Sequence, residues 1–236
     1  MFFRTLTEST DSHARTGLLG LAGVEIPTPV FMPVGTQASI KGVFLDEVAS
    51  MGYRLILSNT YHLFLRQGYN LPLPLHTFMN WPHALLTDSG GYQAFSLAER
   101  VKLSDQGVEF QSHIDGKKHL FTPENVVEYQ NFLGSDIAMP LDDCPPAHAD
   151  ESRLKAALLR TRNWALRSLQ ARDDLLREGR LSVRLHLFGI HQGVCNVRLS
   201  LQSLQEIQDL PFDGIAAGGL SVGESRDEFR ATLESL

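Results

Sequence analysis

The sequence is poor in cysteine: Cys144 and Cys195 are the only two among its 236 residues. A structural zinc site requires four ligands at characteristic spacings, so these two thiols cannot form one by themselves. Two cysteines also exclude a small secreted scaffold that depends on several disulfides. We therefore expect reduced thiols in a cytoplasmic protein, and no metal site within this chain.

Long hydrophobic runs and an excess of positive charge are also missing. The apolar runs are only a few residues long and no basic segment precedes one at the start, so neither a membrane span nor a signal peptide is predicted. The formal net charge of −6 argues against a general nucleic-acid coat, although a local basic face is compatible with it. With 43% hydrophobic and 20% charged residues, the composition is that of an ordinary globular protein.

Apolar, β-prone segments alternate with segments of helical periodicity along the chain. Strands are predicted at 28–34, 53–57, 84–86, 136–141, 185–190 and 214–217. Helices are predicted at 45–51, 123–133, 150–178 and 197–208, and another begins near the end of the sequence. Thr122 is the expected N-cap of the second helix, and Gly134 closes it. A hairpin is predicted within 107–119, on a two-residue turn at Asp115-Gly116.

The predicted helix at 150–178 has an apolar and a basic face. The apolar side chains expected to point inward are Leu154, Leu158, Trp164, Leu166 and Leu169. The basic side chains expected to point mostly outward are Arg153, Lys155, Arg160, Arg162, Arg167 and Arg172. We interpret this basic face either as a solvated surface or as an RNA contact.

Polar residues or glycines follow five successive predicted strands, at the point where each strand ends. They are Asn59, Asp88, Asp142, Gln192 and the pair Gly218-Gly219. A (β/α)₈ barrel of the TIM type gathers its active site at these carboxyl ends, whereas an open doubly wound sheet concentrates its site at one crevice. We therefore predict an α/β barrel as a single domain over 1–236. About six βα units are visible where a closed barrel needs eight, so the barrel is expected to be incomplete at its C-terminus.

The segment at 84–93 carries the most distinctive of these strand ends. An apolar run stops at Asp88, and Ser89, Gly90, Gly91 and Tyr92 follow. Two glycines let the backbone turn tightly and leave their amides free to donate to a ligand, while Tyr92 offers an aromatic face. An ordinary surface turn is the alternative interpretation.

Together, these groups suit a flat polar heterocycle. Asp142 can accept two N–H donors, Gln192 can donate and accept, and the amides of Gly218 and Gly219 can donate to a carbonyl oxygen. Tyr92 can stack on the ring. A guanine-like edge presents the matching groups, although a single residue of this kind could equally serve as a cap or close a loop.

Several blocks of the sequence also resemble one known family, the bacterial queuine tRNA-ribosyltransferases, which are tRNA-guanine transglycosylases. The blocks are Met-Pro-Val-Gly-Thr at 32–36, Ser-Asn-Thr-Tyr-His-Leu at 58–63, Thr-Asp-Ser-Gly-Gly-Tyr-Gln at 87–93, Ser-His-Ile-Asp-Gly at 112–116, Asp142 with Cys144, Gly-Ile at 189–190 with Gln-Gly at 192–193, and Gly-Gly-Leu at 218–220 with Val-Gly-Glu at 222–224. They occur in the family's order and span nearly the whole chain.

The resemblance implies a pentosyltransferase that exchanges guanine at the wobble position of tRNA for a 7-deazaguanine, in queuosine biosynthesis, through a covalent enzyme–ribose intermediate. By motif, Asp88 matches the catalytic aspartate that acts as the proton acceptor. Residues matching the substrate-binding positions are Ser89, Gly90, Gly91, Tyr92, Asp142, Gln192 and Gly219. Residues matching pocket-lining positions are Asn59, Cys144, Gly218, Leu220 and Glu224. The implied partners are a tRNA with guanine at the wobble position and the free base, and a homodimer is left open.

The sequence departs from the family at its C-terminal end. In the family, a second aspartate that acts as nucleophile and a zinc site of three cysteines and a histidine follow the Gly-Gly-Leu block, and here they would lie beyond Leu236. We therefore expect a truncated transglycosylase, with no cofactor in this chain and weak or no exchange activity. The alternatives are a non-catalytic accessory subunit that binds base or tRNA, and an unrelated barrel hydrolase in which Asp88 acts on a sugar.

Overall fold

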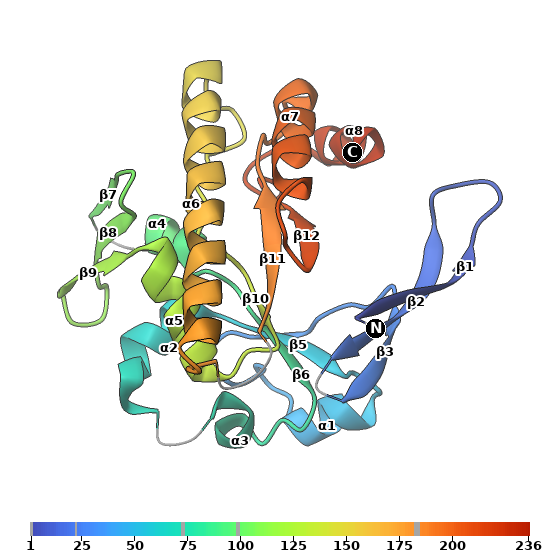
Figure 1. The fold of residues 1–236 in the computed structure, drawn as a ribbon, viewed down its shortest axis with the longest axis vertical. Coiled ribbons are helices and arrows are strands. Elements are labelled where there is room, and N and C mark those ends of the chain that lie inside the picture. Colours follow the sequence, from blue (N-terminus) through green and yellow to red (C-terminus); the bar gives the residue numbers. More distant parts are fainter. Residues whose placement is uncertain (1, 22, 72–73, 98–99, 182–184) are drawn as a thin grey trace.

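A parallel sheet of six strands forms the centre of the computed structural model, which describes residues 2–21, 23–71, 74–97, 100–181 and 185–236 (Figure 1). Its strands are β4 (Val34–Gly35), β5 (Leu55–Ser58), β6 (Ala84–Thr87), β10 (Ile137–Ala138), β11 (His186–His191) and β12 (Gly214–Ala217). They lie side by side in chain order, and every neighbouring pair is parallel. This order is that of a singly wound sheet, whereas a doubly wound sheet reverses direction at a switch point.

The described strands form an open sheet, so they show the predicted α/β class and the parallel strands. Within the described ranges β4 and β12 do not pair with each other, so the sheet has two open edges. The observed fold is a mixed α/β arrangement around a mostly parallel sheet, and a closed barrel is not seen. The carboxyl ends of the strands still converge as expected, because parallel neighbours all point the same way.

Helices follow the strands, as the alternation of patterns predicted. They are α1 (Leu45–Ser50), α2 (Thr60–Gln67), a short 3₁₀ turn at Gly68–Asn70, α3 (Leu75–Met79), α4 (Gly91–Leu97), α5 (Pro123–Leu133), α6 (Glu151–Arg177), α7 (Val197–Gln208) and α8 (Arg226–Ser235). The capping prediction for α5 is confirmed: the Thr122 side chain accepts from the Asn125 amide, and Gly134 ends the helix at a φ of 76°. None of the helices in the described ranges combines the length and apolar character that crossing a membrane requires.

Two antiparallel sheets flank the parallel one. The first comprises β1 (Phe3–Glu8), β2 (Arg15–Leu21) and β3 (Val24–Thr28), and the sequence analysis did not predict it. The second comprises β7 (Val101–Leu103), β8 (Val108–Gln111) and β9 (Lys118–Phe121). The predicted hairpin is its β8–β9 part. The predicted two-residue turn is wrong, because the backbone hydrogen bond that closes the hairpin joins the Ser112 amide to the Lys117 carbonyl, and the hydroxyl of Ser112 accepts from the amides of Ile114 and Asp115 within the wider loop.

Two of the predicted strands are much shorter than expected. The buried strand expected at 28–34 is wrong: only Val34 and Gly35 pair with β5, and Phe31 is 70% exposed. Pro29 and Pro33 lack the amide hydrogen that a central strand must donate, which explains the loss of pairing. The strand expected at 136–141 is reduced to Ile137–Ala138, and Pro140 ends it for the same reason.

The sheet residues alternate between two cores. Ile56 and Leu85 pack against helix residues such as Leu133, whereas Leu55 and Leu86 pack against β2 and β3. Figure 1 shows the helices α2, α5 and α6 on one side and the sheet β1–β3 on the other. Along α6 the inward prediction is confirmed for Leu154, Leu158, Trp164 and Leu169. It is wrong for Leu166, which is 40% exposed because it follows the buried Ala165 by one residue and is rotated off the buried face.

Candidate functional site

A cavity of about 360 Å³ lies at the carboxyl ends of β6, β10, β11 and β12. It is lined by Asp88, Ser89, Tyr92, Gln93, Met139, Asp142, Cys144, Ile190, Gln192, Gly219, Leu220, Ser221 and Val222. Eight of the residues predicted from the sequence are in this set, although they come from segments up to about 130 residues apart. The sheet thus brings the predicted catalytic residue and the predicted base-recognition residues to one place.

Asp88 follows β6 directly and is held by three hydrogen bonds. Its Oδ1 accepts from the backbone N–H groups of Thr60, at 3.0 Å, and Gly90, at 3.1 Å. Its Oδ2 accepts from Nδ2 of Asn59 at 2.5 Å. Burial raises the pKa of Asp88 to about 7, against the opposing effect of these donors. A carboxyl group with a pKa near neutrality can both hold and release a proton, as general acid–base chemistry requires.

Asn59 supports Asp88 from behind. It is buried and absent from the cavity lining, and its Oδ1 accepts from the His62 amide as the N-cap of α2. The same side chain therefore begins a helix and positions a carboxylate. Gly90 completes this support: its φ is 75°, and a Cβ there would lie 2.7 Å from the Tyr61 amide nitrogen. Only glycine lets the turn after Asp88 come so close to α2.

Asp142 faces the cavity from the end of the β10 segment. Its Oδ2 accepts from Nε2 of Gln192 at 2.5 Å, and its Oδ1 lies 3.5 Å from the hydroxyl of Ser89, which donates to it. Burial first, and the neighbouring charge of Asp143 next, raise the pKa of Asp142 to about 6, while the Gln192 amide opposes this rise. Asp142 is therefore mostly ionised at neutral pH and can accept hydrogen bonds from a ligand.

Gln192 has an acceptor with no partner. Its side chain is fully buried, and its Oε1 has no hydrogen-bond partner among the described residues. Leaving a buried acceptor unpaired costs about 1–3 kcal/mol, which a ligand N–H could recover. Glycines make the room: a Cβ at Gly218 would lie 2.7 Å from Nε2 of Gln192, and one at Gly219 would lie 2.7 Å from its Oε1.

Other predicted residues differ in how directly they reach the cavity. Tyr92, on α4, lines the cavity and is 46% exposed, so a ligand can reach its side chain. Glu224 folds back onto its own loop, where its carboxylate accepts from the amides of Ser221 and Val222. Gly91 lies beneath Leu141, with a Cβ position 2.9 Å from Cδ1 of that residue. Gly91, the first residue of α4, and Glu224, in the loop after β12, therefore do not line the cavity.

Cys144 offers no nucleophile, and the described residues offer no metal site. Burial and the charge of Asp142 raise the pKa of Cys144 to about 12, so its thiol stays neutral. In the part of the chain that the structure describes, no group of three or more His, Cys, Asp or Glu residues could hold a metal ion. The described residues therefore do not fit the zinc ion that the family resemblance implies.

Sequence reasoning missed five lining residues: Gln93, Met139, Ile190, Ser221 and Val222. One of them could have been found, because Ile190 and Gln192 are two residues apart and extended backbone places such residues on the same side. No sequence pattern predicts Ser221, which adopts a φ of 62° in the loop after β12.

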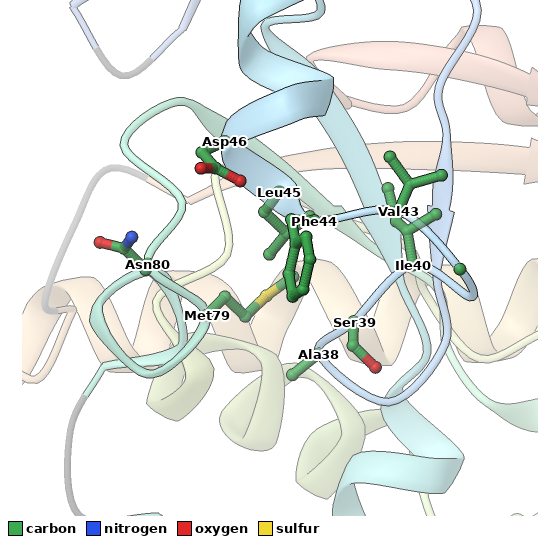
Figure 2. Close-up of a pocket in the computed structure, with 10 residues that line it drawn as sticks. Ala38, Ser39, Ile40, Val43, Phe44, Leu45, Asp46, Met79 and Asn80 are labelled. Carbon is green, nitrogen blue, oxygen red and sulfur yellow. The ribbon is translucent and has the colours of Figure 1, made fainter.

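A larger cavity, of about 810 Å³, lies elsewhere, in the loop before α1 (Figure 2). It is lined by Ala38, Ser39, Ile40, Gly42, Val43, Phe44, Leu45, Asp46, Met79 and Asn80. Phe44 and Met79 point toward one another in Figure 2, and Asp46 is the one charged residue of this lining. Without converging polar groups this hollow offers no chemistry, so the smaller cavity at the strand ends is the candidate site.

Known proteins are similar to this chain over most of its length. The family model described as queuine tRNA-ribosyltransferase matches residues 10–236. Proteins named queuine tRNA-ribosyltransferase are similar to the chain: that of Leptospira biflexa is 49% identical over 96% of this chain and 60% of its own length. Those of Caldanaerobacter subterraneus and Desulforudis audaxviator are 46% and 47% identical, over 95% and 99% of this chain and 59% and 62% of their own lengths. The chain thus spans about 60% of these curated relatives, and it belongs to the queuine tRNA-ribosyltransferase family.

Proposed function

We propose that this chain is the base-binding part of a tRNA-guanine transglycosylase. The reaction would exchange guanine at the wobble position of a tRNA for a 7-deazaguanine, the step that introduces the queuosine precursor. The single observation that carries the proposal is the meeting of Asp142, Gln192 and Gly219 with Asp88 around one cavity. The RNA substrate suits a cytoplasmic enzyme.

The recognition groups match the edge of guanine. Guanine carries an N–H and an amino group side by side, and a carboxylate such as that of Asp142 accepts from both. The unpaired Oε1 of Gln192 offers a further acceptor, and the Gly219 amide can donate to the carbonyl oxygen. Bases that lack this donor pair would not supply the two hydrogen bonds that guanine gives to the buried Asp142, and a site built to accept such bonds discriminates strongly against them.

We assign to Asp88 the transfer of a proton to the departing base and from the incoming one. In an exchange the departing base gains a proton and the incoming base loses one, so one group must give a proton and take one back. A pKa near 7 suits both halves of that cycle. Departure of a base from the anomeric carbon proceeds through an oxocarbenium-like transition state, and two displacements through a carboxylate retain configuration.

The RNA must present its base outside the stack. A duplex-like or stacked loop hides the glycosidic bond, so the target nucleotide has to flip into the cavity. The exposed ring of Tyr92 can then stack on the flipped base. We assign the covalent nucleophile to the part of the family's length that this chain does not span, because Asp88 and Asp142 are the carboxylates among the cavity-lining residues and both have other roles.

The test is incorporation of radiolabelled guanine into tRNA. The 236-residue chain is assayed beside a version extended with the downstream reading frame, and Asp142→Ala in the extended version is the control. We expect exchange in the extended protein and its loss in the variant. Equal exchange by the unextended chain would contradict the assignment of the nucleophile, and exchange that survives Asp142→Ala would contradict the assignment of base recognition.

The alternative of a non-catalytic accessory subunit is less well supported. A subunit that no longer handles the base has no physical need for a buried carboxylate such as Asp142 or for the three donors that hold Asp88. Burying the two carboxylates costs folding stability, and base chemistry explains why the chain keeps them buried.

A further inference from the structure

The small sheet β7–β9 presents a basic outer face. Val108 and Phe110 of β8 are buried, so the alternate residues Glu109 and Gln111 point outward. Lys102 of β7 pairs with Glu109 in the register, and Lys118 of β9 pairs with Gln111. Both lysines therefore stand on the outer face of the sheet.

A shallow groove of about 130 Å³ runs over this face. Arg100, Lys102, Glu109, Gln111 and Lys118 line it together with parts of Val101 and Phe110. Across the described residues, no carboxylate lies within ion-pair distance of Arg100, Lys102 or Lys118. Lys117 beside them is different, since it pairs with Asp115 at 3.2 Å. Among the described residues, the groove thus holds three cations that have no ion-pair partner and one carboxylate, that of Glu109.

The basic face of α6 is not equivalent. Its sequence is compatible with an RNA contact or a solvated surface, but in the structure its cations are paired with carboxylates. The ion pairs are Arg153–Asp143, Lys155–Glu151, Arg160–Asp143, Arg162–Glu206, Arg167–Glu124, Arg172–Asp173 and Arg177–Asp174. A phosphate arriving there would compete with these carboxylates, whereas one arriving at the groove of β7–β9 would not.

The inner side of the same sheet supports the candidate site. Leu103 and Val108 lie beside Gly91, Tyr92 and Asp142 around a small void. Helix α4, which carries Tyr92, packs on β8 and leads into β7 (Figure 1). The sheet is therefore one thin layer, with the wall of the base cavity on its inner side and the basic groove on its outer side.

We propose that the groove of Arg100, Lys102 and Lys118 binds backbone phosphates of the RNA strand next to the nucleotide whose base enters the cavity. This proposal rests on the proposed function, which supplies the RNA. Lys102 on β7 and Lys118 on β9 are two strand spacings apart, each of about 4.8 Å, so they can contact successive groups of a phosphate chain, and Gln111 on β8 between them can bond to phosphate or ribose. A local basic patch on a chain of net charge −6 also concentrates a polyanion at that place.

The experiment measures binding of an anticodon stem-loop with guanine at the wobble position, at several salt concentrations, and binding of free guanine in parallel. We expect the double variant Lys102→Gln with Lys118→Gln to bind the stem-loop about tenfold more weakly near 0.1 M salt, with a salt slope smaller by about 1.4. Guanine binding is expected to stay unchanged. The matched control is Lys155→Gln with Arg162→Gln, which removes the same charge from paired positions on α6.

A third variant is expected to change stem-loop affinity in the opposite direction. Glu109→Gln removes the one carboxylate of the groove, so we expect it to strengthen stem-loop binding by about twofold to fivefold. Equal affinity and slope in the groove variant and in the α6 control would overturn the proposal, as would no stem-loop binding by the parent chain. The guanine measurement separates the phosphate groove from the proposed function. If the parent chain does not bind guanine, the proposed function is overturned instead.

Discussion

Replacing Asp88 with asparagine should change how the stability of the protein depends on pH. Burial raises the pKa of Asp88 from 3.8 to about 7 in the folded chain. Below about pH 4 the folded and the unfolded chain both carry the proton. Between about pH 4 and 7 only the folded chain carries it, so the free energy of unfolding falls as the pH rises. Above pH 7 neither state carries the proton, and the stability that the proton on Asp88 contributes at low pH is gone.

The magnitude follows from the displacement of the pKa. Over the full range it corresponds to about 4 kcal/mol, of which about 2–3 kcal/mol is lost between pH 5 and pH 8. Because Asp88 borders the open cavity, water screens part of this, and about 2 kcal/mol is the expected change. Asparagine does not titrate, so Asp88→Asn should lack this component. The substitution also places the NH2 group of the new asparagine against the Nδ2 donor of Asn59, and two facing donors lower stability by about 1–3 kcal/mol at every pH.

The assay is urea unfolding followed by circular dichroism at pH 5, 6, 7 and 8. The quantity of interest is the difference in unfolding free energy between the parent chain and Asp88→Asn. It should favour the parent chain by about 2 kcal/mol more at pH 5 than at pH 8. Asp11→Asn, in the exposed β1–β2 loop, is the control for loss of a carboxylate. A difference that stays constant with pH, or that grows as the pH rises, would refute the argument that burial holds a proton on Asp88.

Two further substitutions test the surroundings of the cavity. Gly219→Ala places a Cβ 2.7 Å from Oε1 of Gln192 at a φ of 70°, so guanine affinity measured by calorimetry should fall at least about tenfold, and unchanged affinity would contradict the close fit. Arg153→Gln leaves the buried carboxylate of Asp143 with Arg160 as its remaining arginine, so the free energy of unfolding in urea should fall by about 1–2 kcal/mol. Arg177→Gln, an exposed pair on the same helix, should change it by less than about 0.5 kcal/mol.

The carboxyl ends of the strands could be predicted from the sequence because their signal is local. An apolar run that stops at a polar residue, as at Asp88 and Gln192, shows both the strand and its end. The parallel arrangement then follows from the alternation with helices, and it brings these ends together without knowledge of any contact. This explains why Asp88, Asp142 and Gln192 were expected to lie near one another, as they do around the cavity, although more than 100 residues separate the first from the last.

Features that depend on a partner far away in the chain could not be predicted. The ion pairs of α6 are an example, since nothing near Arg160 in the sequence indicates Asp143 as its partner. The strands β1 and β2 were missed because their outward residues are largely exposed and their burial depends on contact with the parallel sheet. The backbone of the segment at 29–33 was misread because apolar side chains outweighed the missing amide hydrogens of Pro29 and Pro33.

The central claim is a division of labour in which Asp142 recognises the base and Asp88 handles its proton. It is tested most directly by titrating free guanine at pH 7 into the parent chain, Asp142→Ala and Asp88→Asn in a calorimeter. We expect Asp142→Ala to weaken binding by about 50-fold or more, because it removes the acceptor for two guanine donors, and Asp88→Asn to stay within about threefold of the parent chain. Equal losses in the two variants, or a larger loss in Asp88→Asn, would contradict the account.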